Sequence, residues 1–141
     1  MPYSDLILAA LDARKKAYCP YSGFAVGAAL LAEDGKIYTG CNIESATYSP
    51  TNCAERTAFF KAVSEGVKTF QAIAIVGGKL GENELETCPP CGVCRQVMAE
   101  FCLPSDFKVI LGKSPKDYIV KTLAELLPLS FGADHLGSDI K

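Results

Sequence analysis

The sequence predicts an α/β layered domain, with a mixed sheet of about five strands covered by helices. Two observations support this class. Short, strongly apolar runs of strand length alternate along the chain with longer segments whose apolar residues recur at helical spacing. The 141 residues show no internal repeat, linker or low-complexity segment, and 49% of them are hydrophobic. A chain of this size and composition can bury one core, so we expect a single domain over residues 1–141.

The N-terminal segment is expected to be a helix. Ser4 can cap its start, because a serine side chain accepts a hydrogen bond from the free N–H groups of a first turn. Apolar residues then recur at helical spacing as far as Tyr18. The helix should end there, since the proline at position 20 disfavours a helical conformation for the residue before it.

A β-hairpin is expected next. Residues 24–32 are nearly all apolar, as in a strand that is buried on both faces. The sequence EDGK at 33–36 contains a hairpin-turn signal, because Asp-Gly suits the positive backbone dihedrals of a tight turn. The chain should therefore return in a second strand over residues 37–42.

A helix, a strand and a further helix are expected in the middle of the chain. One helix should begin near Cys53, and residues 70–78 alternate well enough to form a third strand. After an acidic loop at 81–87, the prolines of CPPCGVC at 88–94 lead into the next helix. Four residues of the first of these helices are expected to face the core: Ala54, Ala58, Phe59 and Ala62. Four residues of the second are expected to form an apolar stripe: Val93, Val97, Met98 and Phe101.

Two strands and a polar end complete the chain. Residues 107–112 and 118–123 are the expected strands, and the sequence SPKD at 114–117 supplies the turn between them. The segment 129–141 becomes polar after a short apolar patch, which predicts a flexible tail.

The charge balance argues against a nucleic-acid partner. The chain has a formal net charge of −2 and a pI near 5.4, whereas nucleic-acid binding draws on clustered Lys and Arg. No positive charge precedes the first apolar stretch, and Asp12 interrupts that stretch early, so we expect neither a signal peptide nor a membrane span. A cytoplasmic protein is therefore expected. Seven cysteines, an odd number, fit a reducing compartment as free thiols or metal ligands.

Two cysteine motifs stand at predicted helix starts. Cys91 and Cys94 are three residues apart, so they lie on one helix face and can share a metal ion. Cys53 stands at the other helix start, where the partial positive charge of the helix favours the thiolate that binds zinc. Three protein ligands leave a fourth position for water, as in catalytic zinc sites. Glu55 would then be the carboxylate that moves protons.

Two alternatives remain open at this point. Asn52 with Glu55 three residues later approximates a capping box, in which Glu55 would only bind backbone N–H groups. Cys88 stands three residues before Cys91, and as a fourth ligand it would close the site and make the zinc structural. The two prolines between these cysteines favour an extended segment that points Cys88 away from the helix face.

Three thiolates on one zinc ion leave a net negative charge, which makes the metal a poorer Lewis acid. Arg56, beside Glu55, and Arg95, beside Cys94, are candidates to balance this charge through hydrogen bonds to the sulfurs. The remaining cysteines and the single histidine are not expected to be ligands: Cys19, Cys41, Cys102 and His135.

Together these motifs resemble the small homotetrameric, zinc-dependent cytidine deaminases that use three cysteines. The likeness runs from Tyr18 to Leu127, nearly the whole chain, in the order and spacing of the family. Four stretches carry it: PYSGFAVGAAL at 20–30, GCNIESATY at 40–48, TNCAERTA at 51–58 and PCGVCRQVMAEF at 90–101. The resemblance implies a cytidine deaminase-like fold.

The resemblance also implies the parts of a metal site. Cys53, Cys91 and Cys94 would hold one zinc ion per chain, with water or hydroxide in the fourth position. Glu55 would take a proton from that water, pass it to the ring nitrogen of cytosine and then protonate the departing ammonia. Arg56 fits the charge-balancing arginine of the family.

A substrate-binding set follows from the same resemblance. Asn42 and Glu44 would hydrogen-bond the ribose hydroxyls, and Phe24 would pack against the base. The backbone N–H of Ala54 would hold the base carbonyl. Phe131 is the best match to an aromatic residue near the C-terminus of the family, which reaches the active site of a neighbouring subunit in a homotetramer.

The expected function is hydrolytic deamination of cytidine and deoxycytidine to uridine and deoxyuridine with release of ammonia, a step of pyrimidine salvage. Such an enzyme is a hydrolase that acts on the carbon–nitrogen bond of a cyclic amidine. Its partner would be a small nucleoside, with no nucleic acid and no membrane. Two alternatives are a deaminase of a related aminopyrimidine nucleoside antibiotic and a non-catalytic, zinc-stabilised binding module.

Overall fold

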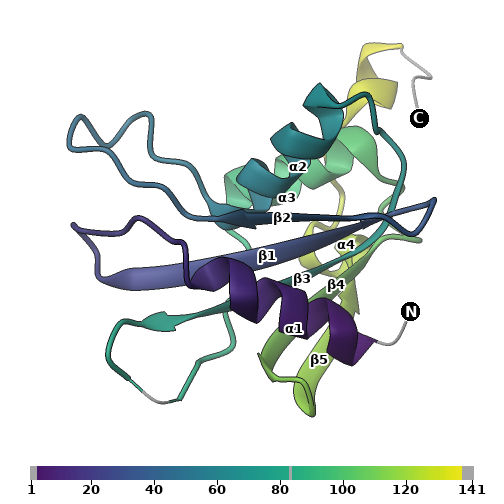
Figure 1. Cartoon of the computed structure of the whole chain (residues 1–141). Helices are drawn as coiled ribbons and strands as arrows, with labels where there is room; N and C mark the ends of the chain where they lie inside the picture. The colour runs from purple at the N-terminus through teal and green to yellow at the C-terminus, as the bar shows by residue number, and fades with distance from the viewer. Residues whose placement is uncertain (1–2, 83, 138–141) are drawn as a thin grey trace.

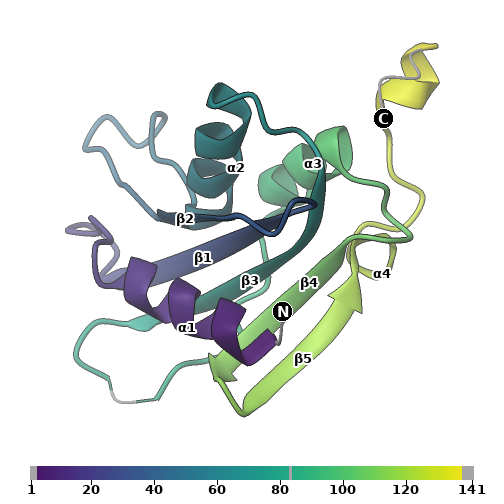
Figure 2. The same ribbon diagram turned by 45° about the vertical axis from the view of Figure 1, so that its right-hand side comes forward.

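A computed structural model describes residues 3–82 and 84–137 and confirms the predicted α/β layered class (Figure 1). The elements in chain order are α1 (Tyr3–Arg14), β1 (Phe24–Ala32), β2 (Ile37–Cys41), α2 (Ala54–Ser64), β3 (Phe70–Lys79), α3 (Gly92–Phe101), β4 (Lys108–Ser114), β5 (Asp117–Thr122), α4 (Leu123–Leu126) and a 3₁₀ turn (Ala133–Leu136). The five strands form one sheet in the order β2-β1-β3-β4-β5. Figure 2 shows α1 on one face of this sheet and α2 and α3 on the other.

The sheet is mixed, as predicted. β1 pairs antiparallel with both β2 and β3, and β4 pairs antiparallel with β5. β3 and β4 are parallel, and α3 lies in the connection between them. The loop 80–91 contains Cys88 and the candidate ligand Cys91 and leads into α3. It therefore begins at the carboxyl end of β3. In open α/β sheets ligands commonly bind beyond the carboxyl ends of strands, so this edge is where a site is expected.

Each face of the sheet has its own apolar core. On the α2 and α3 face, Phe59 packs against Phe70 with ring centroids 5.1 Å apart. On the α1 face, Leu6 and Ile7 are fully buried against residues of β1, β3 and β4. Central strands buried on both faces need near-continuous apolar sequences, which explains the unbroken run of β1. The four residues of α2 predicted to face the core are all fully buried.

Two glycines allow helices to approach the sheet closely. A Cβ atom at Gly27 would clash with the Ala10 carbonyl oxygen of α1. A Cβ atom at Gly40 would clash with the Ala54 carbonyl oxygen and lie 2.6 Å from the Ala58 nitrogen. Gly40 of β2 thus sets the position of the first turn of α2, where the candidate site begins.

The first helix ends at Arg14 and not near Tyr18 as predicted. Arg14 donates from Nε to the Ala25 carbonyl at 2.8 Å and from Nη2 to the Gly78 carbonyl at 2.7 Å, which holds the last turn against β1 and β3. Tyr18 instead joins a short β-bridge, in which its N–H donates to the Asn42 carbonyl at 2.9 Å. Tertiary hydrogen bonds have overridden the helical spacing.

The apolar stripe predicted for α3 is partly wrong. The buried residues of α3 are Cys94, Met98 and Ala99. Val93 is 58% exposed, because the face that α3 turns to the core is the one that carries Cys94. Val97 and Phe101 pack against the core while only partly buried.

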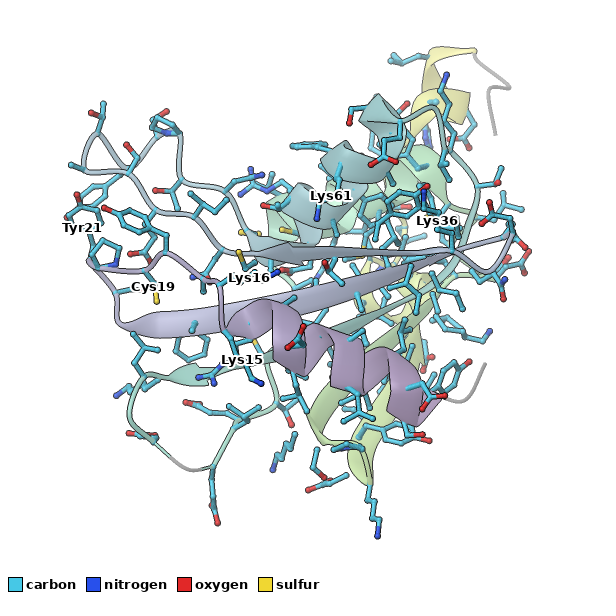
Figure 3. All side chains as sticks on the ribbon, in the orientation of Figure 1. Lys15, Lys16, Cys19, Tyr21, Lys36 and Lys61 are labelled. Carbon is cyan, nitrogen blue, oxygen red and sulfur yellow. The ribbon has the colours of Figure 1, made fainter. Side chains whose placement is uncertain are left out.

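The edge strand β2 has a charged neighbour. Lys61 of α2 donates to the Thr39 carbonyl, and Figure 3 shows its side chain over β2. A lysine at an edge strand discourages pairing with a strand of another chain.

The C-terminal segment leaves the sheet through α4. Thr122 and Glu125 form a capping box at the start of that helix. The 3₁₀ turn lies within the segment predicted to be a flexible tail, and residues 138–141 of that segment lie outside the described residues. Within residues 3–82 and 84–137 no helix has the length and apolarity needed to cross a membrane.

Candidate functional site

Three thiols converge where α2 and α3 begin. The Sγ atoms of Cys53 and Cys91 are 3.7 Å apart, those of Cys91 and Cys94 are 3.3 Å apart, and all three lie within 4.8 Å of one another. A tetrahedral zinc ion with Zn–S bonds of about 2.3 Å places its sulfurs about 3.8 Å apart. The three thiols therefore fit a zinc ion. Cys94 is buried and Cys91 is exposed, so the cluster lies at the surface.

Local backbone conformation brings these thiols together. Cys53 and Cys91 are the N-cap residues of α2 and α3, and both have an extended backbone, with φ and ψ of −77° and 157° and of −68° and 167°. Cys94 follows in the first turn of α3, and its backbone N–H donates to the Cys91 sulfur at 3.4 Å. Both helix N-termini thus direct their partial positive charge at sulfur atoms, which favours thiolates.

One thiol of the cluster ionises before another. The pKa of Cys53 is lowered to about 5 despite its partial burial. The largest cause is a hydrogen bond from the Cys94 thiol, and a hydrogen bond from Arg56 contributes less. Donating that hydrogen bond to Cys53, together with burial, raises the pKa of Cys94. In the absence of metal, Cys53 is therefore a thiolate at neutral pH and Cys94 keeps its proton.

The two arginines named as charge-balancing candidates differ in what they contact. Arg56 donates from Nη2 to the Cys53 sulfur at 3.2 Å. Arg95 donates instead to the backbone carbonyls of Pro90, at 2.8 Å, and Leu126, at 2.6 Å. The hydrogen bonds of Arg95 therefore go to the loop and to α4, and its expected bond to a ligand sulfur is not formed.

Glu55 lies beside the thiols. Its side chain is 5% exposed, and it is the one charged residue that is buried in the described part of the chain. Burial is the main cause that raises the pKa of Glu55 to about 7, and the neighbouring Cys53 thiolate raises it further, while a hydrogen bond with Cys94 opposes the shift. A carboxyl group with this pKa can both accept and donate a proton near neutral pH.

The geometry explains how Glu55 and a cysteine two positions earlier share one site. Residues i and i+2 diverge on a regular helix, but Cys53 is the extended N-cap and stands outside the helix. The capping-box interpretation is wrong, because the N-cap is Cys53 and not Asn52, and the N-cap side chain makes no capping hydrogen bond. The Asn52 amide instead donates to the Thr57 hydroxyl at 3.3 Å.

Cys88 is absent from the metal-ligand cluster found among the described residues. A Cβ atom placed on Gly77 would lie 2.8 Å from the Cys88 sulfur and 3.2 Å from Cε1 of Phe24. Cys88 therefore packs against β3 beside the Phe24 ring. Burial raises the pKa of Cys88 to about 11, so it remains a neutral thiol.

Asn42 fixes the start of β1. Its Nδ2 donates to the Phe24 carbonyl at 2.8 Å, and its Oδ1 accepts from the Val26 N–H at 2.9 Å. The side-chain amide thus continues the pairing of β1 where β2 has ended. Because an amide has two N–H donors and two lone pairs, Asn42 keeps one donor and one acceptor for another partner.

Glu44 is held by the loop before β1. Its Oε1 accepts from the backbone N–H groups of Tyr21, at 3.0 Å, and Ser22, at 3.1 Å, and its Oε2 accepts from the Ser22 hydroxyl. The hydroxyl bond of Ser22 is the main cause that lowers the pKa of Glu44, so this group is a carboxylate. Its Oε2 retains a lone pair for a further hydroxyl donor.

A cavity of about 370 Å³ adjoins Glu44. Its lining residues are Tyr21, Ser22, Glu44, Tyr48 and Thr51. Figure 3 shows Tyr21 at one end of the molecule and Lys36, from the hairpin turn, toward the other. A larger cavity of about 540 Å³ lies at the C-terminal ends of α2 and α3 and includes none of the predicted site residues among its lining. The smaller cavity is lined by the Glu44 carboxylate, which can accept a hydrogen bond from a ligand hydroxyl group. We therefore favour the smaller cavity as part of the site.

Ala54 and Phe131 complete the set of predicted residues. Ala54 is the first residue of α2, where backbone N–H groups have no partner within the helix. Phe131 is 58% exposed, its ring stacks on His135 at 5.1 Å, and its carbonyl accepts from the Gln96 amide. Its ring therefore points to solvent.

Sequence reasoning missed two residues that shape the site. Ser22 holds both Glu44 and, through an accepted hydrogen bond of 3.0 Å, the N–H of Phe24. The sequence could have predicted the bond from Ser22 to Phe24, because a serine in a turn commonly binds the backbone two residues later. Gly77 leaves the space that Cys88 fills, and that contact carries no local sequence signal.

The comparisons with known proteins agree with this geometry. Residues 2–110 match the family described as the cytidine and deoxycytidylate deaminase zinc-binding region. The chain is 54% identical over 136 residues to a cytidine deaminase of Sporosarcina psychrophila, covering 96% of each protein. It is 53% identical over 131 residues to a cytidine deaminase of Halalkalibacterium halodurans, covering 93% of this chain and 95% of that one.

Solved structures extend the likeness to the fold. The crystal structure of cytidine deaminase from Burkholderia pseudomallei superposes with a TM-score of 0.83 at 47% identity, covering 93% of this chain and 100% of that one. Cytidine deaminase from Mycobacterium tuberculosis superposes with a TM-score of 0.79 at 36% identity, covering 94% and 98%. With its three thiols in place for a zinc ion, the chain belongs to the zinc-binding cytidine and deoxycytidylate deaminase family.

Proposed function

We propose that this protein is a cytidine deaminase that converts cytidine and deoxycytidine to uridine and deoxyuridine and releases ammonia. The observation that carries the proposal is a buried carboxyl group, Glu55, with a pKa of about 7 beside three thiols that fit zinc. The name cytidine deaminase borne by relatives more than half identical supports the substrate. We place the reaction in pyrimidine salvage in the cytoplasm.

The chemistry divides between the metal ligands and Glu55. Cys53, Cys91 and Cys94 would hold a zinc ion, which when bound acts as a Lewis acid that makes water a nucleophile near neutral pH. The Glu55 carboxylate takes a proton from the attacking water and delivers it to the ring nitrogen N3 of the base. The same carboxylate then takes the second proton, from the hydroxyl group added to the ring carbon, and delivers it to the departing amino group as the carbonyl forms. One water is consumed and one ammonia is released for each nucleoside.

The surroundings of the thiols suit this chemistry. Arg56 donates to Cys53, and two helix N-termini face the sulfurs, so part of the negative charge of three thiolates is offset. The burial of Glu55 keeps its pKa near the pH at which proton transfer in both directions is efficient.

The nucleoside is held by groups around this centre. The free N–H of Ala54 would bind the base carbonyl, and Phe24, fixed by Asn42 and Ser22, would pack against the base. The remaining donor of Asn42 and the remaining lone pair of Glu44 would bind the sugar hydroxyls.

We also propose a homotetramer in which Phe131 reaches a neighbouring site. The exposure of the Phe131 ring and of three consecutive apolar residues of β5 supports association of chains. Those residues are Tyr118, Ile119 and Val120. Light scattering should give four times the 15.0 kDa mass of one chain, and the mass of a single chain would contradict the tetramer.

The function is tested by ammonia release from cytidine, with Glu55→Ala and Glu100→Ala measured alongside. Glu100 is exposed near the C-terminal end of α3 and serves as a matched control. We expect turnover by the unchanged protein and by Glu100→Ala, and none by Glu55→Ala, with zinc retained in all three. Turnover of an aminopyrimidine nucleoside antibiotic but not of cytidine would show that cytidine is not the substrate. Zinc retention without any turnover would favour a structural metal centre.

A further inference from the structure

Arg95 joins three segments of the chain at the edge of the metal centre. Its guanidinium donates from Nε to the Pro90 carbonyl at 2.8 Å and from Nη1 to the Leu126 carbonyl at 2.6 Å. Its backbone N–H donates to the Cys91 carbonyl at 3.0 Å. Arg95 thus binds the carbonyls of Pro90 and Cys91 before α3 and the carbonyl of Leu126, the last residue of α4.

The loop that carries Cys91 is attached to the rest of the fold at separate points along its length. Among its described residues, 80–82 and 84–91, backbone bonds run from Leu80 to Gly23 and from Glu86 to Gly77, and Cys88 packs against β3. Pro89 and Pro90 have no N–H groups, so this stretch can be held only through its carbonyls and side-chain packing. The side-chain bond from Arg95 to the Pro90 carbonyl therefore holds the residue directly before the ligand Cys91.

The same side chain reaches the C-terminal segment. The Leu126 carbonyl stands at the end of α4, where backbone carbonyls lack partners within the helix. Five residues later the Phe131 carbonyl accepts from the Gln96 amide at 2.8 Å. Two adjacent residues of α3 therefore hold both ends of the segment 126–131, beside Cys94 on the same turn.

We propose that Arg95 is a positioning residue that fixes the metal-binding loop and links it to segment 126–131. It acts through the backbone at Pro90 and touches no reacting atom. Loss of its side chain frees the Cys91 ligand to move, which speeds metal release, and frees Leu126. The proposal rests on the proposed zinc-dependent function, but its test measures zinc without substrate, so either idea can fail alone.

The test compares zinc release from Arg95→Met, Arg95→Lys and the unchanged protein, followed with a chromophoric chelator. Methionine keeps much of the apolar stem and removes both donors. We expect Arg95→Met to release zinc about tenfold faster, the lower end for loss of a group that orients metal ligands. Lysine should restore only part of the retention, because one ammonium cannot reproduce the planar fork that serves two carbonyls.

A control separates this role from general stability. Ile110→Val lies in the core on the α1 face of the sheet, so it weakens the fold without touching the loop. It should leave zinc release within about twofold of the unchanged protein. Equal acceleration in Ile110→Val at matched thermal stability would overturn the proposal, as would unchanged release from Arg95→Met. If Arg95→Met does not fold, Arg95→Lys with release equal to that of the unchanged protein would overturn it.

Hydrogen exchange tests the link to the C-terminal segment. Adding zinc should increase the protection of the amides of Leu127 and of residues 129–131 in the unchanged protein and not in Arg95→Met. Gln96→Leu should lower protection around Phe131 while zinc release stays unchanged, because Gln96 bonds only the far end of that segment. Zinc-dependent protection that persists in Arg95→Met would show that Arg95 does not carry the link.

Discussion

The Arg56 guanidinium donates to the Cys53 sulfur at 3.2 Å across the first turn of α2. Nε of Arg56 is buried and has no hydrogen-bond partner within the described residues. A buried positive group with an unused donor beside a thiolate is placed to stabilise more negative charge than that one sulfur carries. Arg56 would therefore offset part of the net negative charge that three thiolates leave on one zinc ion.

Removing that charge should make zinc binding more sensitive to acid. In Arg56→Gln the pKa of Cys53 rises, because a hydrogen bond and a positive charge that favour its thiolate are lost. Zinc binds thiolates and releases their protons, so the pH midpoint of zinc uptake should move upward. Zinc uptake between pH 5 and pH 8, followed with a metal indicator, measures the shift. Lys61→Gln removes a charge from the other end of the same helix and should leave the midpoint unchanged.

Glu55 should make the metal-free protein less stable at alkaline pH. Burial raises its pKa from 4.5 to about 7, so the fold favours the protonated form. The associated stability is complete below pH 4.5 and is lost as the pH rises to 7. Metal-free Glu55→Gln, which stays neutral, should therefore be more stable than the unchanged protein at pH 8 by about 3 kcal/mol. Urea unfolding at pH 4 and pH 8 measures this difference, and equal stability at pH 8 would contradict it.

Alanine variants at Cys88 and at Cys91 should differ in the amount of zinc that they retain. Cys88 packs beside Phe24 and is not one of the three clustered thiols, so Cys88→Ala should retain one zinc per chain after dialysis. Cys91→Ala removes one of three converging sulfurs and should lose most of its zinc. Metal analysis of the two variants decides between three ligands and four. Equal zinc loss in both would restore Cys88 as a ligand.

Two glycines allow stability and metal binding to be separated. Gly27→Ala pushes α1 from the sheet, whereas Gly40→Ala pushes the first turn of α2, which follows the ligand Cys53. Overpacking of this kind costs about 1–3 kcal/mol, so both variants should unfold at lower urea concentration. Zinc affinity should fall in Gly40→Ala and stay near that of the unchanged protein in Gly27→Ala. Competition with a chelator measures the affinities, and equal affinity of the two variants would argue against Gly40 positioning the site.

Most of the fold could be predicted because its signals are local. The apolar run of β1, the Asp-Gly turn after it and the buried face of α2 each depend on residues close in the sequence. The end of α1 depends on carbonyls of Ala25 and Gly78, which are distant along the chain, and helical spacing cannot reveal such partners. Val93 was misplaced for a similar reason, since the contacts of Cys94 set the rotation of α3.

The candidate site follows the same division. The motif at Cys91 and Cys94 and the helix start at Cys53 predicted which thiols meet. Spacing alone could not explain how Glu55 joins them, because the answer lies in the extended backbone of an N-cap. Nor could adjacency to a ligand predict the contacts of Arg95, whose partners are a proline carbonyl and the end of a short helix.

The sulfurs of Cys53 and Cys91 meet although 38 positions separate them in the sequence. Between them the chain completes α2 and the whole of β3, which must lie between β1 and β4 before the two helix starts face each other. The native geometry in which a metal ion bridges them thus depends on the assembled centre of the sheet. We therefore expect zinc capture to come late in refolding, and we expect the bound ion to slow the opening of the sheet.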